Sequence, residues 1–186
     1  MKITDLCQML QPEFPGCPMA TLRDQLRWAQ RELCAEGNAW VHTDSPVVVG
    51  ALSDEPEIEA APGAEILRIF RLKDGVRELR AGIDYWQPTA ATVAFHVSPA
   101  AGELDGGIVC RPALGRDMPA ELLARWGEAI LHGARYQLFL MPQPWRDPAM
   151  ADFYNMKFLS AQAEARHLAT AGHQRGSLQM QVPRFV

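Results

Sequence analysis

The sequence lacks any long apolar run, and its longest, PVVVGAL, occupies only residues 46–52. Because a helix needs roughly 20 apolar residues to cross a bilayer, we expect no membrane-spanning helix and no membrane partner. The opening segment, MKITDLCQML, contains Asp5 and is soon followed by Pro12, which interrupts any signal-type apolar stretch. We therefore expect no export signal.

Motifs that hold metals or cofactors are also missing. The chain has 4 cysteines but no CxxC pair, and none of its 5 histidines completes a zinc-binding spacing. It contains no GxSxG elbow, Walker loop or GxGxxG fingerprint, and the Gly106–Gly107 pair after Asp105 is typical of a turn. These absences predict free buried thiols in a reducing cytosol, no metal, no cofactor and no catalytic residue.

Positive charge is scarce and scattered. The 18 Lys and Arg residues against 22 Asp and Glu residues leave a formal net charge of -4. The densest basic stretch, residues 68–80, is interrupted by Asp74 and Glu78. A protein that binds nucleic acid by neutralising phosphates needs clustered cations, so we expect no specific binding of DNA or RNA.

What the sequence does contain is an ordinary globular composition: 186 residues, 48% hydrophobic and 22% charged. This length suits one domain, or one domain with an embedded subdomain. The spacing of apolar residues changes from helical to strand-like and back. We predict an α+β fold that comprises a bundle of about four helices (residues 1–38 and 116–172), an inserted antiparallel β-rich subdomain (39–115) and an extended C-terminal tail (173–186).

Local signals mark the ends of the first two predicted helices. Thr4 is a candidate cap for a short helix that Pro12 ends. Thr21 with Asp24 resembles a capping pair for a longer helix that Gly37 ends.

The two C-terminal helices have comparable signals. One has Pro119 in its first turn and ends at Pro142, and Gly133 inside it permits close packing. The other opens where Asp147 is followed by Pro148, which predicts a cap with proline at the first helical position.

The middle of the chain reads as short strands. Runs rich in β-branched and aromatic residues predict strands at residues 40–49, 65–72, 76–85, 92–97 and 107–111. Lys73-Asp74-Gly75 contains the Asp-Gly pair of a tight hairpin turn, in which glycine adopts positive φ at no steric cost. The stretches 53–63 and 98–106 predict exposed loops.

Aromatic residues concentrate in the two C-terminal helices and the turn between them. They can form the helical core, but they also exceed what one buried face uses, which indicates a subunit interface. Residues 173–186 have a proline and no helical period, so we expect them to order only against another molecule. The candidate subunit-interface or portal-binding residues are Trp126, Tyr136, Trp145, Tyr154, Phe158, Pro183, Arg184 and Phe185.

Residues 119–166 resemble a known family. A helix opened by Met-Pro leads into LFLMPQPWRDPAMADFYNMKFLSAQAEAR. The turn PQPWRDP, Phe158 in the following helix and Ala165-Arg166 near its end are similar to the C-terminal helical hairpin of head-to-tail adaptor (connector) proteins of tailed bacteriophages. The short N-terminal helices, the β-rich middle and the closing Pro183-Arg184-Phe185 agree with that family in layout.

The resemblance implies a non-enzymatic structural protein of the virion neck, made in the host cytoplasm. Its copies would form a homo-oligomeric ring, usually dodecameric, between the portal protein and the tail or nozzle protein. DNA would pass through this channel without specific binding, which agrees with the lack of a basic stripe. We then expect the two C-terminal helices to line the ring, Trp145→Ala to weaken ring formation more than folding, and residues 173–186 to order on the portal.

Two other classes of function remain open. The β-rich middle of a small cytosolic module could bind a ligand or a protein between its hairpins, which predicts a monomer or dimer with a ligand-dependent melting shift. Alternatively, Cys34 or Cys110 could act as a nucleophile beside a histidine, which predicts loss of activity on alkylation.

Overall fold

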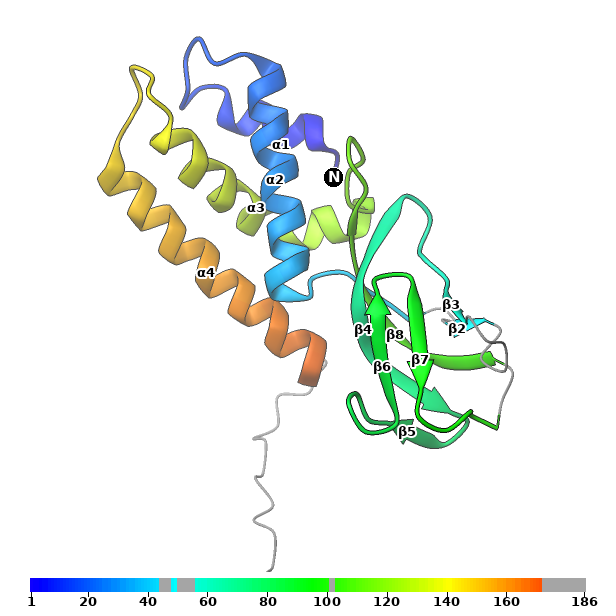
Figure 1. Cartoon of the computed structure of the whole chain (residues 1–186). Helices are drawn as coiled ribbons and strands as arrows, with labels where there is room; N and C mark the ends of the chain where they lie inside the picture. The colour runs from blue at the N-terminus through cyan, green and yellow to red at the C-terminus, as the bar shows by residue number, and fades with distance from the viewer. Residues whose placement is uncertain (44–47, 50–55, 101–102, 172–186) are drawn as a thin grey trace, which may run out of the picture.

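A computed structural model describes residues 1–43, 48–49, 56–100 and 103–171 (Figure 1). The helices are α1 (Ile3–Leu10), α2 (Met19–Gly37), α3 (Ala120–Leu140) and α4 (Pro148–Ala171). The strands are β1 (Val41–His42), β2 (Val48–Val49), β3 (Glu57–Ile58), β4 (Ala64–Asp74), β5 (Arg77–Leu79), β6 (Tyr85–Thr89), β7 (Thr92–Phe95) and β8 (Glu103–Pro112). The predicted α+β class is therefore confirmed, while the predicted tail at 173–186 lies outside the described residues.

The strands form one antiparallel sheet in the order β5-β4-β8-β2-β3-β7-β6, with β1 also beside β8. β4 and β8 are the long central pair, which runs from Ala64 opposite Pro112 to Lys73 opposite Asp105 with two shifts of register on the way. The backbone N–H of Ile69 on β4 donates to the side-chain oxygen of Gln87 on β6 at 2.9 Å. The far edge of the sheet therefore curls back toward β4, as Figure 1 shows.

The Gly106–Gly107 pair corrects one prediction, because it lies within β8 and not in a turn. A Cβ atom at Gly106 would lie 2.0 Å from the carbonyl oxygen of Arg71. Only glycine allows β4 to approach β8 so closely, at a point where the pairing register shifts. The loop predicted at 98–106 is correspondingly shorter, since β8 already begins at Glu103.

The hairpin predicted at residues 73–75 is confirmed. Asp74 pairs with Arg77 across the turn, and Gly75 has a φ of 58°. The long strand predicted beyond this turn is divided, because the chain turns again after β5 and re-enters the sheet as β6 beside β7.

The first two helix starts also differ from prediction. α1 begins before Thr4, and the Asp5 carboxylate accepts the backbone N–H of Lys2 at 2.8 Å in place of a threonine cap. α2 begins directly after Pro18, so Thr21 lies inside its first turns. In both cases a residue upstream of the threonine has the extended backbone that starts the helix.

The helices pack closely around Gly133 of α3. A Cβ atom there would lie 2.8 Å from the Cβ of Ala29 on α2 and 2.9 Å from the ring of Phe158 on α4. Three helices therefore meet at one point where only a hydrogen atom fits, as the predicted close packing at Gly133 requires.

Glu65 of β4 joins the helical bundle to the sheet. Its carboxylate accepts two hydrogen bonds from Arg31 of α2, at 3.0 and 3.3 Å, and one from Arg111 of β8 at 2.9 Å. Arg31 also donates to the carbonyl oxygen of Pro112. The Arg31 hydrogen bonds, followed by those of Arg111, hold the pKa of Glu65 below its usual range.

We predict that Glu65→Gln weakens this junction at neutral pH but not in acid. Because folding lowers the pKa of Glu65, its charge stabilises the fold above the unfolded-state value of about 4.3 and ceases to do so as the pH falls through the folded-state value. Urea unfolding at pH ~7 should show a loss of about 1 kcal/mol or less, since the pair is partly exposed. The loss should shrink as the pH falls below about 4.3.

The matched control is Glu103→Gln, which changes an exposed glutamate on β8. This variant should unfold like the wild type in the same urea titrations. A loss for Glu65→Gln that does not change with pH would contradict the assignment of the effect to the carboxylate charge.

Candidate interaction surfaces

Trp145 fixes the turn between α3 and α4 to the body of the bundle. Its indole N–H donates to the carbonyl oxygen of Leu138 at 3.2 Å. Its ring meets that of Phe14, in the loop after α1, edge-on at 6.2 Å, and Phe14 in turn lies 4.9 Å from the ring of Phe139. Trp145 therefore makes contacts within its own chain.

Asp147 starts α4. Its Oδ1 accepts the backbone N–H groups of Ala149 at 3.0 Å and Met150 at 3.1 Å, so the cap predicted before Pro148 is confirmed. Its own N–H donates to the carbonyl oxygen of Phe139 at 3.0 Å. The start of α4 is therefore bonded directly to the end of α3, which makes the two helices a rigid hairpin.

A stack of side chains holds α4 against α3 near this turn. The rings of Phe139 and Tyr154 are parallel within 2° at 5.9 Å, and the Arg135 guanidinium lies 5.2 Å from the Tyr154 ring. Arg135 also pairs with Glu13 through two hydrogen bonds of 2.8 and 2.5 Å. Tyr154 is half-buried, and its ring packs against side chains of its own chain.

The other predicted interface aromatics are divided between the core and its margins. Phe158 is only 2% exposed and Trp126 7%, so both belong mainly to the core. Tyr136 is half-buried, with its ring 6.2 Å from that of Trp28. The predicted residues Pro183, Arg184 and Phe185 lie outside the described residues.

A row of exposed apolar side chains runs along the outward side of α4, among polar residues such as Lys157 and Ser160. The helix buries Ala151, Phe158, Gln162 and Ala165 on one side. At 100° per residue, Met156 points almost directly away from that side, and it is 65% exposed. We call this surface the α4 stripe, and its exposed apolar residues are Met150, Phe153, Met156 and Leu159.

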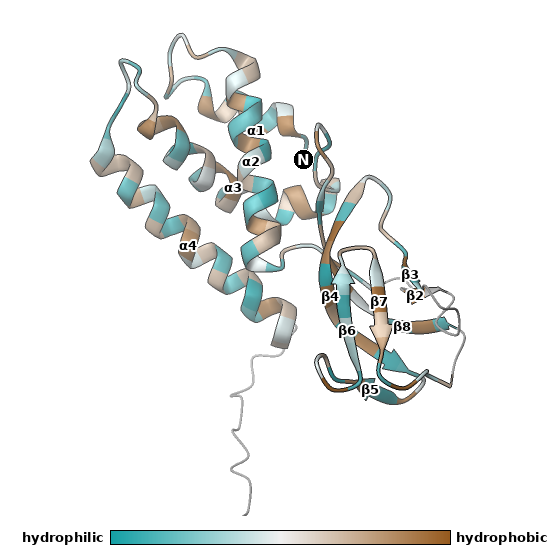
Figure 2. Ribbon diagram, viewed as in Figure 1, coloured by the Kyte–Doolittle hydropathy of each residue, from teal (hydrophilic) through white to brown (hydrophobic). Residues whose placement is uncertain are grey.

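The sequence prediction did not name the α4 stripe, because its candidate interface residues in the helices were all aromatic and the most exposed stripe residue is Met156. Figure 2 shows hydrophobic and hydrophilic residues alternating along the whole of α4, so the apolar side chains are not confined to one face. A wheel centred on Phe158 would have placed Met156 opposite the core.

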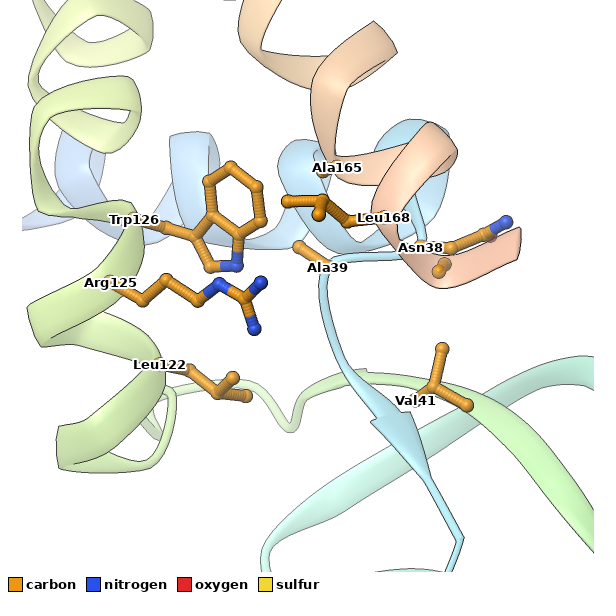
Figure 3. Close-up of a pocket in the computed structure, with 9 residues that line it drawn as sticks. Asn38, Ala39, Val41, Leu122, Arg125, Trp126, Ala165 and Leu168 are labelled. Atoms are coloured by element: carbon orange, nitrogen blue, oxygen red, sulfur yellow. The ribbon is translucent and has the colours of Figure 1, made fainter. Parts of the chain in front are cut away.

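A groove runs between α3 and α4. Its wider part, a cavity of about 360 Å³, has Trp126, His132 and Lys157 in its lining, and burial lowers the pKa of His132 below its usual range. Its other part, of about 170 Å³, reaches the junction with the sheet, where Trp126 and Leu168 face each other (Figure 3). Among the described residues, no cluster of three side chains that could hold a metal ion is found.

A second recess lies at the end of the sheet, where β4, β5 and β7 meet the adjoining loops. This β-tip pocket, of about 280 Å³, is lined by Asp74, Arg77, Leu79, Ile83, Asp84, Phe95, His96, Val97, Ser98, Pro99 and Ala100. Ile83 and Val97 protrude strongly at its rim. Arg77 pairs with Asp84 at 2.6 Å, and Asp74 accepts the backbone N–H of Ala100 at 3.0 Å.

The two candidate nucleophiles, Cys34 and Cys110, are poorly suited to nucleophilic chemistry. Cys34 and Cys110 are completely buried. Burial raises the pKa of the Cys34 thiol to about 12 and also raises the pKa of Cys110. Both thiols therefore stay protonated near neutral pH, whereas catalysis needs the thiolate.

Comparisons with known proteins return no relative: no protein-family profile matches the chain, and a search of curated proteins finds no match. Within the described part of the chain, no helix is both long enough and apolar enough to cross a membrane. Inferences about function therefore rest on the surfaces described above and on the resemblance in the helical hairpin.

Because Trp145 contacts its own chain, we predict that Trp145→Ala destabilises the monomer, by about 3 kcal/mol as for other large packed rings. Trp145→Phe keeps most of the ring packing and should lose only about 1 kcal/mol for the hydrogen bond to Leu138. Urea unfolding of the two variants measures both values.

Trp86→Ala is the control for removal of a tryptophan ring. Because Trp86 on β6 is 44% exposed, this substitution should lower the free energy of unfolding by less than Trp145→Ala does. If Trp145→Ala folds as stably as the wild type but no longer assembles, the role of Trp145 lies at the subunit interface expected from the sequence.

Proposed function

We propose that this protein is a head-to-tail adaptor of a tailed bacteriophage. It acts without enzymatic activity or cofactor, as a structural protein of the virion neck, after synthesis in the host cytoplasm. Its copies form a ring, dodecameric as in the family it resembles, between the portal protein and the tail or nozzle protein.

The observation that carries the proposal is the α3–α4 hairpin. The PQPWRDP turn is the part of the chain most similar to the adaptors, and two of its residues have definite tasks: Trp145 anchors the turn and Asp147 starts α4. These contacts give the residues of the turn a definite part in a helical hairpin, a structure that a ring can repeat.

The exposed surface supports assembly. A contiguous apolar face on a helix is unusual in a monomer and marks an interaction site. The α4 stripe places several exposed apolar side chains close together, since Met156 is 65% exposed and Phe153 and Leu159 lie within one turn of it. A subunit contact covers it without any change of fold.

The charge of the chain agrees with a channel wall. A net charge of -4 gives no attraction for phosphates, so DNA that moves through the ring is neither held nor read.

We predict that light scattering after size exclusion detects a ring-sized species, either with the protein alone or only after mixing with the portal protein from the same genome. A heterologous contact closes into a ring when the rotation between subunits is suitable, which is the physical basis of this expectation. A portal protein from an unrelated phage is the control and should not be bound.

A monomer that ignores its own portal would contradict the adaptor proposal. It would favour the alternative, a small module that binds a ligand or protein through its β-rich part, with the β-tip pocket as the place to search by ligand-dependent melting shifts.

We also predict that the portal contact depends on residues 173–186, which include Pro183, Arg184 and Phe185. A chain ending at Ala171 keeps every described helix and strand and should melt like the full chain. It should no longer bind the portal in a pull-down assay. A double substitution, Arg184→Ala with Phe185→Ala, is the milder variant, and undiminished portal binding by both would refute this role of the tail.

A further inference from the structure

Two surfaces of the described residues lie on different parts of the fold, the apolar α4 stripe on the bundle and the mixed apolar and charged β-tip pocket on the sheet. The α4 stripe lies along the helix that forms the left edge of the molecule in Figure 1, whereas the β-tip pocket lies around β5 at the lower right. In this view the first half of α4, which carries the stripe, lies on the far side of α2 and α3 from the sheet, whereas the C-terminal end of α4 comes close to the sheet. The two surfaces therefore belong to different parts of the fold. Within one copy of the chain, the α4 stripe does not reach the β-tip pocket.

The symmetry of possible contacts distinguishes two ways to cover these surfaces. If the α4 stripe met itself, the contact would be isologous and would close as a dimer in which both β-tip pockets stay exposed. If the stripe of one copy meets the pocket of the next, a single kind of contact covers both surfaces on every copy.

Shape and charge favour the second arrangement. Met156 and Phe153 protrude, and the β-tip pocket is a recess of about 280 Å³ with Leu79 and Phe95 in its lining. The ammonium group of Lys157 lies 5.5 Å from the Phe153 ring, at the edge of the stripe.

The pocket lining offers a partner for that cation. It contains two carboxylates, Asp74 and Asp84, and a single guanidinium, Arg77, which pairs with Asp84 at 2.6 Å. Among the described residues, Asp74 accepts a neutral backbone N–H, from Ala100, and forms no ion pair, so its carboxylate is available to an approaching lysine.

We propose that the α4 stripe of one copy packs into the β-tip pocket of the next copy. This inference rests on the proposed ring function and names the two faces that form its repeating contact. The partner is a second copy of this chain, with Met156 and Phe153 filling the recess and Lys157 near Asp74.

The first experiment compares two variants with two matched controls in the full-length protein. Met156→Glu places a charge in the stripe, and His167→Glu places the same charge on the outward side of α4 about 16 Å further along. Val97→Asp alters the pocket rim, and Leu114→Asp alters a residue with the same exposed fraction, 81%, beyond the other end of β4 and β8.

We expect Met156→Glu and Val97→Asp to raise the concentration for half-assembly at least about 30-fold, as the loss of a central interface residue does. Both controls should assemble like the wild type. Sedimentation velocity measures assembly, and circular dichroism checks that each variant is folded. If the wild type assembles only on the portal, the number of copies per portal replaces the half-assembly concentration as the measurement.

A mixing experiment decides between the two symmetries. The Met156→Glu chain keeps an intact pocket and the Val97→Asp chain keeps an intact stripe, so an equimolar mixture should form one-to-one dimers and nothing larger. Homodimers of Val97→Asp alone, with no mixed dimer, would show a stripe-to-stripe contact and overturn the inference.

The outcomes also separate this inference from the proposed function. If all four variants assemble like the wild type, the contact between copies lies elsewhere, although the adaptor proposal stands. If wild-type copies form rings that depend on Met156 and Val97 but never bind the portal, the adaptor proposal is wrong and the contact stands. Wild-type copies that neither associate nor load side by side on the portal contradict both.

Discussion

The carboxylate of Glu65 holds the two halves of the molecule together. It receives Arg31 from the helical bundle and Arg111 from the central strand pair, so a single acidic group connects α2, β4 and β8. Arg68 of β4 adds a second link to the bundle, since its guanidinium donates to the carbonyl oxygen of Ala35 in α2 at 2.8 Å. A fixed junction gives the α4 stripe and the β-tip pocket one relative orientation, which the proposed head-to-tail contact would need in order to repeat at a constant angle around a ring.

Features that arise from neighbouring residues were predictable from the sequence. The Asp147-Pro148 start of α4 and the Asp74-Gly75 hairpin both depend on side-chain or backbone preferences within four residues, and both occur where the sequence places them. The α+β class follows from the same kind of signal, since the change in apolar spacing marks where helices give way to strands and return.

Features that depend on distant parts of the chain were not predictable in this way. In the sequence, Gly106 is typical of a turn. In the fold, its lack of a side chain allows the backbone of Arg71, 35 residues earlier in the chain, to come close. The residues next to Glu65 in the sequence do not predict its partners, because Arg31 and Arg111 come from other elements of the fold. The candidate surfaces also depend on distant parts of the chain. The sequence predicts Phe158 as an interface residue, but packing against the other helices buries it.

Packing and exposure use different side chains along the hairpin, and the most exposed residue of the α4 stripe is a methionine, Met156. Phe158 and Tyr154 serve packing inside the monomer, where a large ring in one orientation is an advantage. The proposed contact between separately folded copies would benefit from a side chain that adapts its shape, as the unbranched thioether of Met156 does at little cost. The residues that best suit assembly are therefore those that the fold of a single copy leaves unused.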